Sequence, residues 1–289
     1  MNNMKKIFVI GASSVIANSI VDKFLTKDNS YEVVKITRNK KYMNDDEFIF
    51  IDSYKKLNES ICKFDSTSED IIILAFAYLG KTGFDDNTPQ SLDIENQNKV
   101  FDINFTQMKE ALNTSINFLK RKGGTIIYLS SAAAYPVRPS NIPYGLSKKY
   151  IDELILKQKV LNKKFEISTL SVKIGFVDTP LNHGKTKTPF STTPNKVADK
   201  VLISLEKKKD SVFVPGVLYI ITRFLITFPK FLLGQIEIIF PSKNALRSLC
   251  SAFTASRASA ALVSRMDRIK HTSDGQTVSF GNCPISKST

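Results

Sequence analysis

The sequence has few of the residues that build disulfide frameworks and metal sites. Its 289 residues include 3 cysteines and 2 histidines. Cys62, Cys250 and Cys283 form no C-x-x-C pair, so neither a disulfide framework nor a cysteine metal site is expected. His183 and His271 lie far apart in the sequence without a partner cluster, and we predict no metal site from them. This cysteine usage favours a reducing, cytoplasmic compartment.

Long uninterrupted hydrophobic runs are also scarce. The first apolar run, Ile7–Ile10, ends at Gly11, so it is too short for a signal peptide and is typical of a strand. The stretch Val217–Phe240 is strongly apolar, but three charged residues and Pro229 interrupt it, which argues against a simple membrane span. This segment can lie on a bilayer as an amphipathic hairpin, cover a substrate cleft or serve in packing.

Acidic residues are fewer than basic ones. The 41 Lys and Arg exceed the 27 Asp and Glu, which gives a net charge of +14. Such an excess favours an anionic partner, which can be a phosphate group, a membrane surface or nucleic acid. Because the lysines are scattered and no nucleic-acid-binding motif accompanies them, we predict no nucleic-acid partner.

Apolar runs of strand length alternate with helical stretches along the chain. Strands alternating with helices predict βαβ units and a parallel sheet. We therefore expect an α/β fold, a doubly wound parallel sheet (Rossmann fold) of about seven strands with an apolar C-terminal helical extension. The expected strands are Ile7–Ile10, Glu32–Thr37, Phe48–Ile51, Ile71–Ala75, Thr125–Leu129, Glu166–Val172 and Ser211–Val214, and helical periodicity follows Gly11 through Leu25 and spans 91–121, 143–163 and 194–208.

Three segments differ in composition. Residues 1–215 are expected to form the dinucleotide-binding and catalytic domain, and residues 216–241 an apolar lid or membrane-contacting segment. Residues 242–289 contain seven Lys and Arg, two Asp and few large apolar residues. This basic tail has little to bury, and we expect it to pack poorly.

The turn after the first strand is a candidate phosphate-binding loop. A turn from a strand into a helix directs backbone N–H groups and the positive end of the helix dipole towards a pyrophosphate. The usual fingerprint has glycine where Val15 and Ala17 stand, and Val15 is the weaker match. An ordinary strand–turn–helix explains this motif equally well. The residues expected to contact a dinucleotide here are Gly11, Ser13, Ser14, Val15 and Ile16.

The end of the second strand carries a basic residue and no acidic one. Arg38, in Thr37–Asn39, can pair with a 2′-phosphate, which favours NADP(H) over NAD(H). The alternative is that Arg38 is a solvated surface charge. Asp52 follows the third strand and is placed to bind an adenine, although aspartate is also a common helix cap.

A serine, a tyrosine and a lysine form the densest chemical signal. Ser131 follows the fifth strand, and Asn141 can cap a helix that begins near Pro143. Tyr144 and Lys148, four residues apart, would share one face of that helix. A lysine ammonium near the phenol is expected to lower the tyrosine pKa, which suits a general acid or base. Ser131 can donate a hydrogen bond to a substrate oxygen.

These residues resemble the short-chain dehydrogenase/reductase family over residues 5–240. The resemblance implies catalytic roles for Ser131, Tyr144 and Lys148, and for Asn104, which would hold a water of the proton relay. A family segment Pro-Gly-x-x-x-Thr would match Ile174–Thr179, although Ile174 replaces the proline. The family's Asn-Asn-Ala-Gly motif is absent. Further residues that the resemblance assigns to the cofactor are Ala75, Ala77, Tyr144, Lys148, Gly175, Val177 and Thr179.

Three further stretches resemble one branch of the family, which contains the decaprenylphosphoryl-2-keto-pentose reductase. They are Ala75–Gly80, residues 138–145, and Val214-Pro215 together with the apolar stretch that follows in the sequence. The resemblance implies a keto-sugar substrate on a polyprenyl phosphate and peripheral contact with the inner face of the cell membrane. The family also implies a homo-oligomer.

We therefore expect NADPH-dependent reduction of a ketone to an alcohol, with the loop Phe176–Pro194 closing over the substrate. One alternative is an enzyme that acts on a soluble nucleotide sugar or another small carbonyl. The other is a nucleotide-binding relative without catalytic activity, for which Val15, Ile174 and the missing Asn-Asn-Ala-Gly motif leave room.

Overall fold

The computed structural model describes residues 4–80, 84–85, 88–89, 93–137, 141–179, 181 and 190–227. These residues belong to the first of two units into which the chain divides, Met1–Pro229. The expected basic tail 242–289, the end of the apolar segment 216–241 and about half of the loop 176–194 lie outside the described residues.

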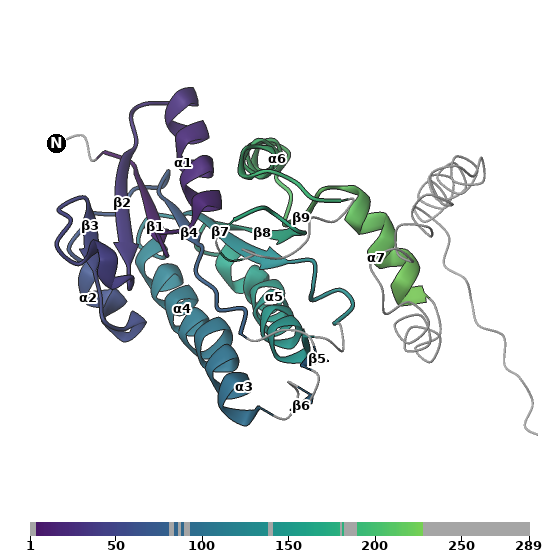
Figure 1. Ribbon diagram of the computed structural model, residues 1–289. Coiled ribbons are helices and arrows are strands. Elements are labelled where there is room, and N and C mark those ends of the chain that lie inside the picture. Colours follow the sequence, from purple (N-terminus) through teal and green to yellow (C-terminus); the bar gives the residue numbers. More distant parts are fainter. Residues whose placement is uncertain are drawn as a thin grey trace, which may run out of the picture. The chain divides into compact units, whose positions relative to one another are not determined.

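Seven parallel strands form one sheet (Figure 1). Their order, β3-β2-β1-β4-β7-β8-β9, is that of a doubly wound Rossmann sheet, so the predicted seven-stranded parallel sheet is confirmed, whereas the predicted apolar C-terminal extension stays a prediction. A separate two-stranded pair consists of β5 and β6. The bounds are β1 Lys6–Ile10, β2 Glu32–Thr37, β3 Phe48–Phe50, β4 Ile71–Leu74, β5 Phe84–Asp85, β6 Thr88–Pro89, β7 Gly124–Ser131, β8 Ile167–Ile174 and β9 Ser211–Val214.

Helices cover both faces of the sheet. Helices α1 and α6 lie together on one face, and α2, α4 and α5 lie on the other (Figure 1). The expected helical stretch 91–121 is divided by a π-helical turn at Asp102–Gln107. The helices are α1 Val15–Lys27, α2 Leu57–Ile61, α3 Ile94–Phe101, α4 Met108–Leu119, α5 Ile142–Lys163, α6 Pro194–Glu206 and α7 Val217–Thr227, with short 3₁₀ turns at Lys40–Tyr42 and Tyr54–Lys56.

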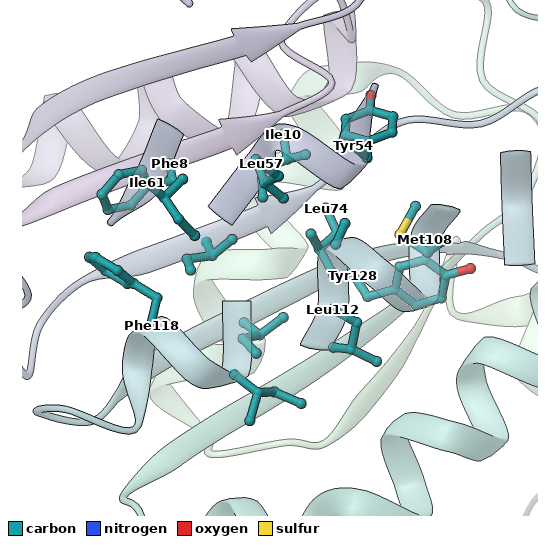
Figure 2. Close-up of a cluster of buried hydrophobic side chains, with 14 of the residues drawn as sticks. Phe8, Ile10, Tyr54, Leu57, Ile61, Leu74, Met108, Leu112, Phe118 and Tyr128 are labelled. Atoms are coloured by element: carbon teal, nitrogen blue, oxygen red, sulfur yellow. The ribbon is translucent and has the colours of Figure 1, made fainter. Parts of the chain in front are cut away.

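The core has two layers because successive residues of a strand face opposite sides of the sheet. In β1, Phe8 and Ile10 pack towards α2 and α4, whereas Ile7 and Val9 pack towards α1 and α6. Figure 2 shows the first layer, in which Phe8 and Phe118 meet edge to face at 5.1 Å between ring centres. Each such side chain contributes roughly 1.5–3 kcal/mol when it is fully buried.

Two negative findings concern the described part of the chain. No helix there is both long and apolar enough to cross a membrane. Within the same residues, no group of three or more His, Cys, Asp and Glu side chains is arranged to hold a metal ion.

Candidate active site

The carboxyl ends of the parallel strands lie along one edge of the sheet. The strand order reverses between β1 and β4, where doubly wound sheets bind their ligands. The edge collects Gly11 after β1, Arg38 after β2, Ala75 after β4, Ser131 at the end of β7 and Gly175 after β8. The fold thus brings the nucleotide-binding and catalytic candidates to one side of the molecule.

The turn after β1 requires a glycine. Gly11 has a φ of +94°, and a Cβ at this position would stand 2.7 Å from the backbone nitrogen of Phe76. Ser14 caps α1 by accepting a hydrogen bond from the Ala17 N–H at 3.3 Å. The N–H groups of Val15, at the first helical position, and Ile16 have no carbonyl within the helix to bind, so they suit an anion. The Val15 side chain is 42% exposed, so it extends to solvent from this end of the helix.

Arg38 is held by its neighbours. Its guanidinium carbon lies 4.7 Å from the ring centre of Tyr54, and Nη1 donates a hydrogen bond to Oε1 of Gln107. Tyr54 in turn stacks on Phe76 at 3.9 Å between ring centres. The Nε atom of Arg38 is buried without a hydrogen-bond partner. The alternative of a freely solvated charge is therefore wrong, and the unpartnered Nε is a donor available to a phosphate oxygen.

Asp52 lies on the surface at the same end of the sheet. Its carboxylate pairs with Lys56 at 2.8 Å, and this hydrogen bond holds the pKa of Asp52 below its usual value. The cap of the following 3₁₀ turn is Ser53, so the alternative role of Asp52 as a cap is wrong. Its contact with an adenine stays a prediction.

Asn104 lies fully buried in the π-helical turn between α3 and α4. Its side-chain amide pairs with the backbone of Tyr78, accepting from the N–H and donating to the carbonyl, both at 2.7 Å. Single π-helical turns within helices often mark functional sites. Here the turn fixes the chain that follows β4. The relay water predicted at Asn104 stays a prediction.

Ser131, Tyr144 and Lys148 come together as predicted. Tyr144 and Lys148 lie one turn apart on α5, and both are buried against the end of β7. The Ser131 side chain lies close enough to Tyr144 to lower the pKa of the phenol. Lys148 Nζ donates to the Leu129 carbonyl at 3.1 Å and lies 5.9 Å from the ring centre of Tyr144.

The pKa of Tyr144 differs from the sequence prediction. Burial raises the pKa of Tyr144, and the nearby Ser131 side chain lowers it only in part. The expected lowering by Lys148 is therefore wrong for this arrangement, because the ammonium group is bound to Leu129 and not to the phenol. Burial also lowers the pKa of Lys148 to about 8.

Helix α5 begins close to the predicted residue, but without the predicted cap. The helix begins at Ile142, close to the expected Pro143, and Asn141 occupies the cap position. The Asn141 side chain makes no capping hydrogen bond, so its predicted capping role is wrong. Pro143 stands in the first turn, where its missing N–H costs no helical bond.

The segment after β8 is packed beneath α7. The Gly175 N–H donates to the Val214 carbonyl at 2.8 Å, and a Cβ on Gly175 would meet Leu218 at 2.4 Å. A side chain at this position would therefore require the Leu218 side chain to move. Val177 is buried, and Thr179 Oγ1 lies 3.5 Å from its carbonyl oxygen. Gly175, Val177 and Thr179 thus lie at the carboxyl edge of the sheet, the same edge as the other cofactor-binding candidates.

Sequence reasoning missed several residues around the site. Tyr54, Phe76 and Gln107 surround Arg38, but their distance from it in the sequence gave no signal. Asp152, buried on α5, was also missed. It follows Lys148 by four residues, and its place between Ile151 and Ile155 on an apolar helix face was a usable signal.

Comparisons with known proteins agree with this geometry. A family model described as short chain dehydrogenase matches residues 80–189, which contain Ser131, Tyr144 and Lys148. An uncharacterized oxidoreductase of Schizosaccharomyces pombe is 36% identical over 89 residues, which are 31% of this chain and 35% of that protein. The match thus spans about a third of that curated relative's length.

Solved structures share the fold. A short chain dehydrogenase from Burkholderia cenocepacia J2315 in complex with NADP has a TM-score of 0.66 and 18% identity, covering 81% of this chain and 98% of that one. An alcohol dehydrogenase from Thermococcus sibiricus complexed with 5-hydroxy-NADP has a TM-score of 0.58 and 16% identity, covering 73% and 96%.

Fold and site together define a Rossmann-fold protein with a serine, tyrosine and lysine at the carboxyl edge of its sheet. With the family match over residues 80–189, which include that site, the chain is similar to the short-chain dehydrogenase/reductase family. The resemblance to its decaprenylphosphoryl-2-keto-pentose reductase branch stays a prediction.

Proposed function

We propose that this chain is an NADPH-dependent carbonyl reductase. The observation that carries the proposal is the placement of Ser131 beside the buried Tyr144, with Lys148 one helical turn away, at the edge where doubly wound sheets bind ligands. The NADP-bound state of the structural relative from Burkholderia cenocepacia supports the choice of cofactor.

The residues at this edge suit NADPH. The unpartnered Nε of Arg38 is a donor for a 2′-phosphate, and the N-terminus of α1 is suited to a pyrophosphate. Gly11 keeps the turn after β1 free of a side chain. When bound, NADPH supplies a hydride for the carbonyl carbon.

Tyr144 supplies the proton. Burial keeps its pKa above the usual value, so the phenol is protonated at neutral pH and can donate to a carbonyl oxygen. Ser131 can donate a hydrogen bond to the same oxygen. Lys148, with a pKa of about 8, carries a positive charge at neutral pH that stabilises the phenolate left behind.

A turnover assay tests the proposal. The purified protein should oxidise NADPH in the presence of at least one ketone from a panel of diketones, hydroxyketones and keto sugars, and it should prefer NADPH to NADH. Tight NADPH binding without consumption by any of these carbonyls would favour the non-catalytic alternative.

The finer proposal is that the substrate is a keto sugar carried on a polyprenyl phosphate. Helix α7 supports it, because Val217, Tyr219 and Ile220 are exposed apolar side chains, 50% exposed in the case of Tyr219. The net charge of +14 favours anionic lipids. A cytoplasmic location, peripheral membrane contact and homo-oligomeric assembly belong to the same proposal.

Flotation with liposomes checks the membrane contact. The protein should float with vesicles that contain phosphatidylglycerol, and less so with neutral phosphatidylcholine vesicles, because the basic surface adds electrostatic attraction. Replacing Tyr219 and Ile220 with glutamate should reduce the floated fraction. A protein that stays unbound in both cases would favour the alternative, a soluble nucleotide sugar or another small carbonyl.

A further inference from the structure

A buried carboxylate lies behind the catalytic residues. Asp152 is 6% exposed and accepts hydrogen bonds from three hydroxyl groups. Ser130 donates at 2.7 Å, Tyr135 at 3.0 Å, and Ser171 donates to the second carboxylate oxygen. Burying a carboxylate is costly unless it is hydrogen-bonded, and these three hydroxyl groups supply the hydrogen bonds that offset the cost.

The three donors belong to three different parts of the fold. Ser130 lies in β7 beside Ser131, Tyr135 lies in the loop after β7, and Ser171 lies in β8. Asp152 itself follows Lys148 by four residues on α5. One side chain therefore joins the helix that carries Tyr144 to the strand end that carries Ser131.

We propose that Asp152 is a positioning residue, which holds α5 against β7 and the following loop and places a negative charge beside Lys148. The proposal rests on the proposed function. Its two parts are separable. The hydrogen bonds keep the Tyr144 and Ser131 hydroxyl groups within reach of one another, and the carboxylate charge acts on the neighbouring ammonium group.

The charges around Asp152 agree with this role. Its charge raises the pKa of Lys148, opposing the effect of burial, which lowers that pKa to about 8. Burial raises the pKa of Asp152 itself, while the hydroxyl donors and the positive charge of Lys173 lower it. The other titratable groups facing the network are Tyr128 of β7, Tyr135 of the loop, Tyr144 of α5 and Lys173 of β8, whereas Glu153 of α5 is exposed and acts on Tyr135.

Asp152→Asn tests the charge, because asparagine keeps the shape of the side chain and removes the charge. In protein labelled with ¹³C at lysine Cε, the NMR titration of Lys148, assigned with Lys148→Arg, should fall from a pKa of about 8 by roughly one unit. Glu153→Gln is the matched control, since Glu153 is an exposed neighbour on the same helix, and it should leave the titration unchanged. An unchanged pKa of Lys148 in Asp152→Asn would overturn the charge role.

The pH dependence of turnover should follow the titration of Lys148. Because protonated Lys148 is the active form, wild-type kcat should fall as the pH rises through about 8. In Asp152→Asn this decline should begin at a lower pH, by the same shift that the NMR titration gives. A decline at the wild-type pH would contradict the proposal.

Ser130→Ala tests the hydrogen bonds separately, because it removes one donor and leaves the charge in place. We expect kcat to fall several-fold with little change in the KM for NADPH and no shift in the Lys148 titration. Unaltered kcat in both Ser130→Ala and Tyr135→Phe would overturn the positioning role, even if Asp152→Asn failed to fold. If the wild-type protein turns over no ketone, the proposed function fails, whereas the NMR titration, which needs neither cofactor nor substrate, still decides the charge role.

Discussion

Tyr144→Phe is expected to remove nearly all turnover while NADPH binding persists. Phenylalanine keeps the buried ring of Tyr144, which is packed at the end of β7, and deletes only the hydroxyl group beside Ser131. A positioned general acid contributes about 10²–10⁴-fold to rate. We therefore expect kcat with any accepted ketone to fall by that factor, measured as NADPH consumption, while the NADPH dissociation constant changes less than about threefold.

Tyr150→Phe is the matched control for this substitution. Tyr150 lies on the same helix, is 53% exposed and contacts Phe105 with its ring. The two variants make the same chemical change, but only one deletes a hydroxyl group beside Ser131. The control should keep kcat near the wild-type value. Full turnover in Tyr144→Phe would show that another group supplies the proton, and the assignment of the site would fail.

The main features of the fold could be predicted from the sequence because they depend on local patterns. A buried parallel strand is apolar on both faces, so Ile71–Leu74 stood out as a short run without alternation. Gly11 marked the end of β1 for the same local reason, since a positive φ and close backbone approach require glycine. The π-helical turn at Asp102–Gln107 was not predictable, because its hydrogen bonds with Tyr78 involve a distant strand end.

The site was predictable where it depends on spacing and not where it depends on packing. Tyr144 and Lys148 are four positions apart in the sequence, which places them on one face of any helix that contains both. The direction of the Tyr144 pKa shift depends instead on burial and on where the Lys148 ammonium group binds. The partners of Asp152 come from β7, β8 and a loop, so only the folded chain reveals them.

Arg38→Ala is expected to weaken NADPH binding selectively. A charge-assisted hydrogen bond contributes about 1.5–3 kcal/mol, so its loss should raise the Kd for NADPH by roughly 10- to 100-fold. The Kd for NADH should change little, because that cofactor has no 2′-phosphate for the guanidinium to bind. Titration of both cofactors by calorimetry or fluorescence gives the two constants.

Two further variants separate the phosphate contact from other effects of the substitution. Lys40→Ala removes an exposed positive charge two residues away and should leave both constants near wild type. Arg38→Lys keeps the charge but loses the planar guanidinium that stacks on Tyr54, so an intermediate NADPH affinity is expected. Because Arg38 also donates to Gln107, thermal melting without cofactor measures any loss of stability. If Arg38→Ala weakened the binding of NADPH and of NADH equally, the role of Arg38 would be to pack against Tyr54. Other residues would then determine the cofactor preference.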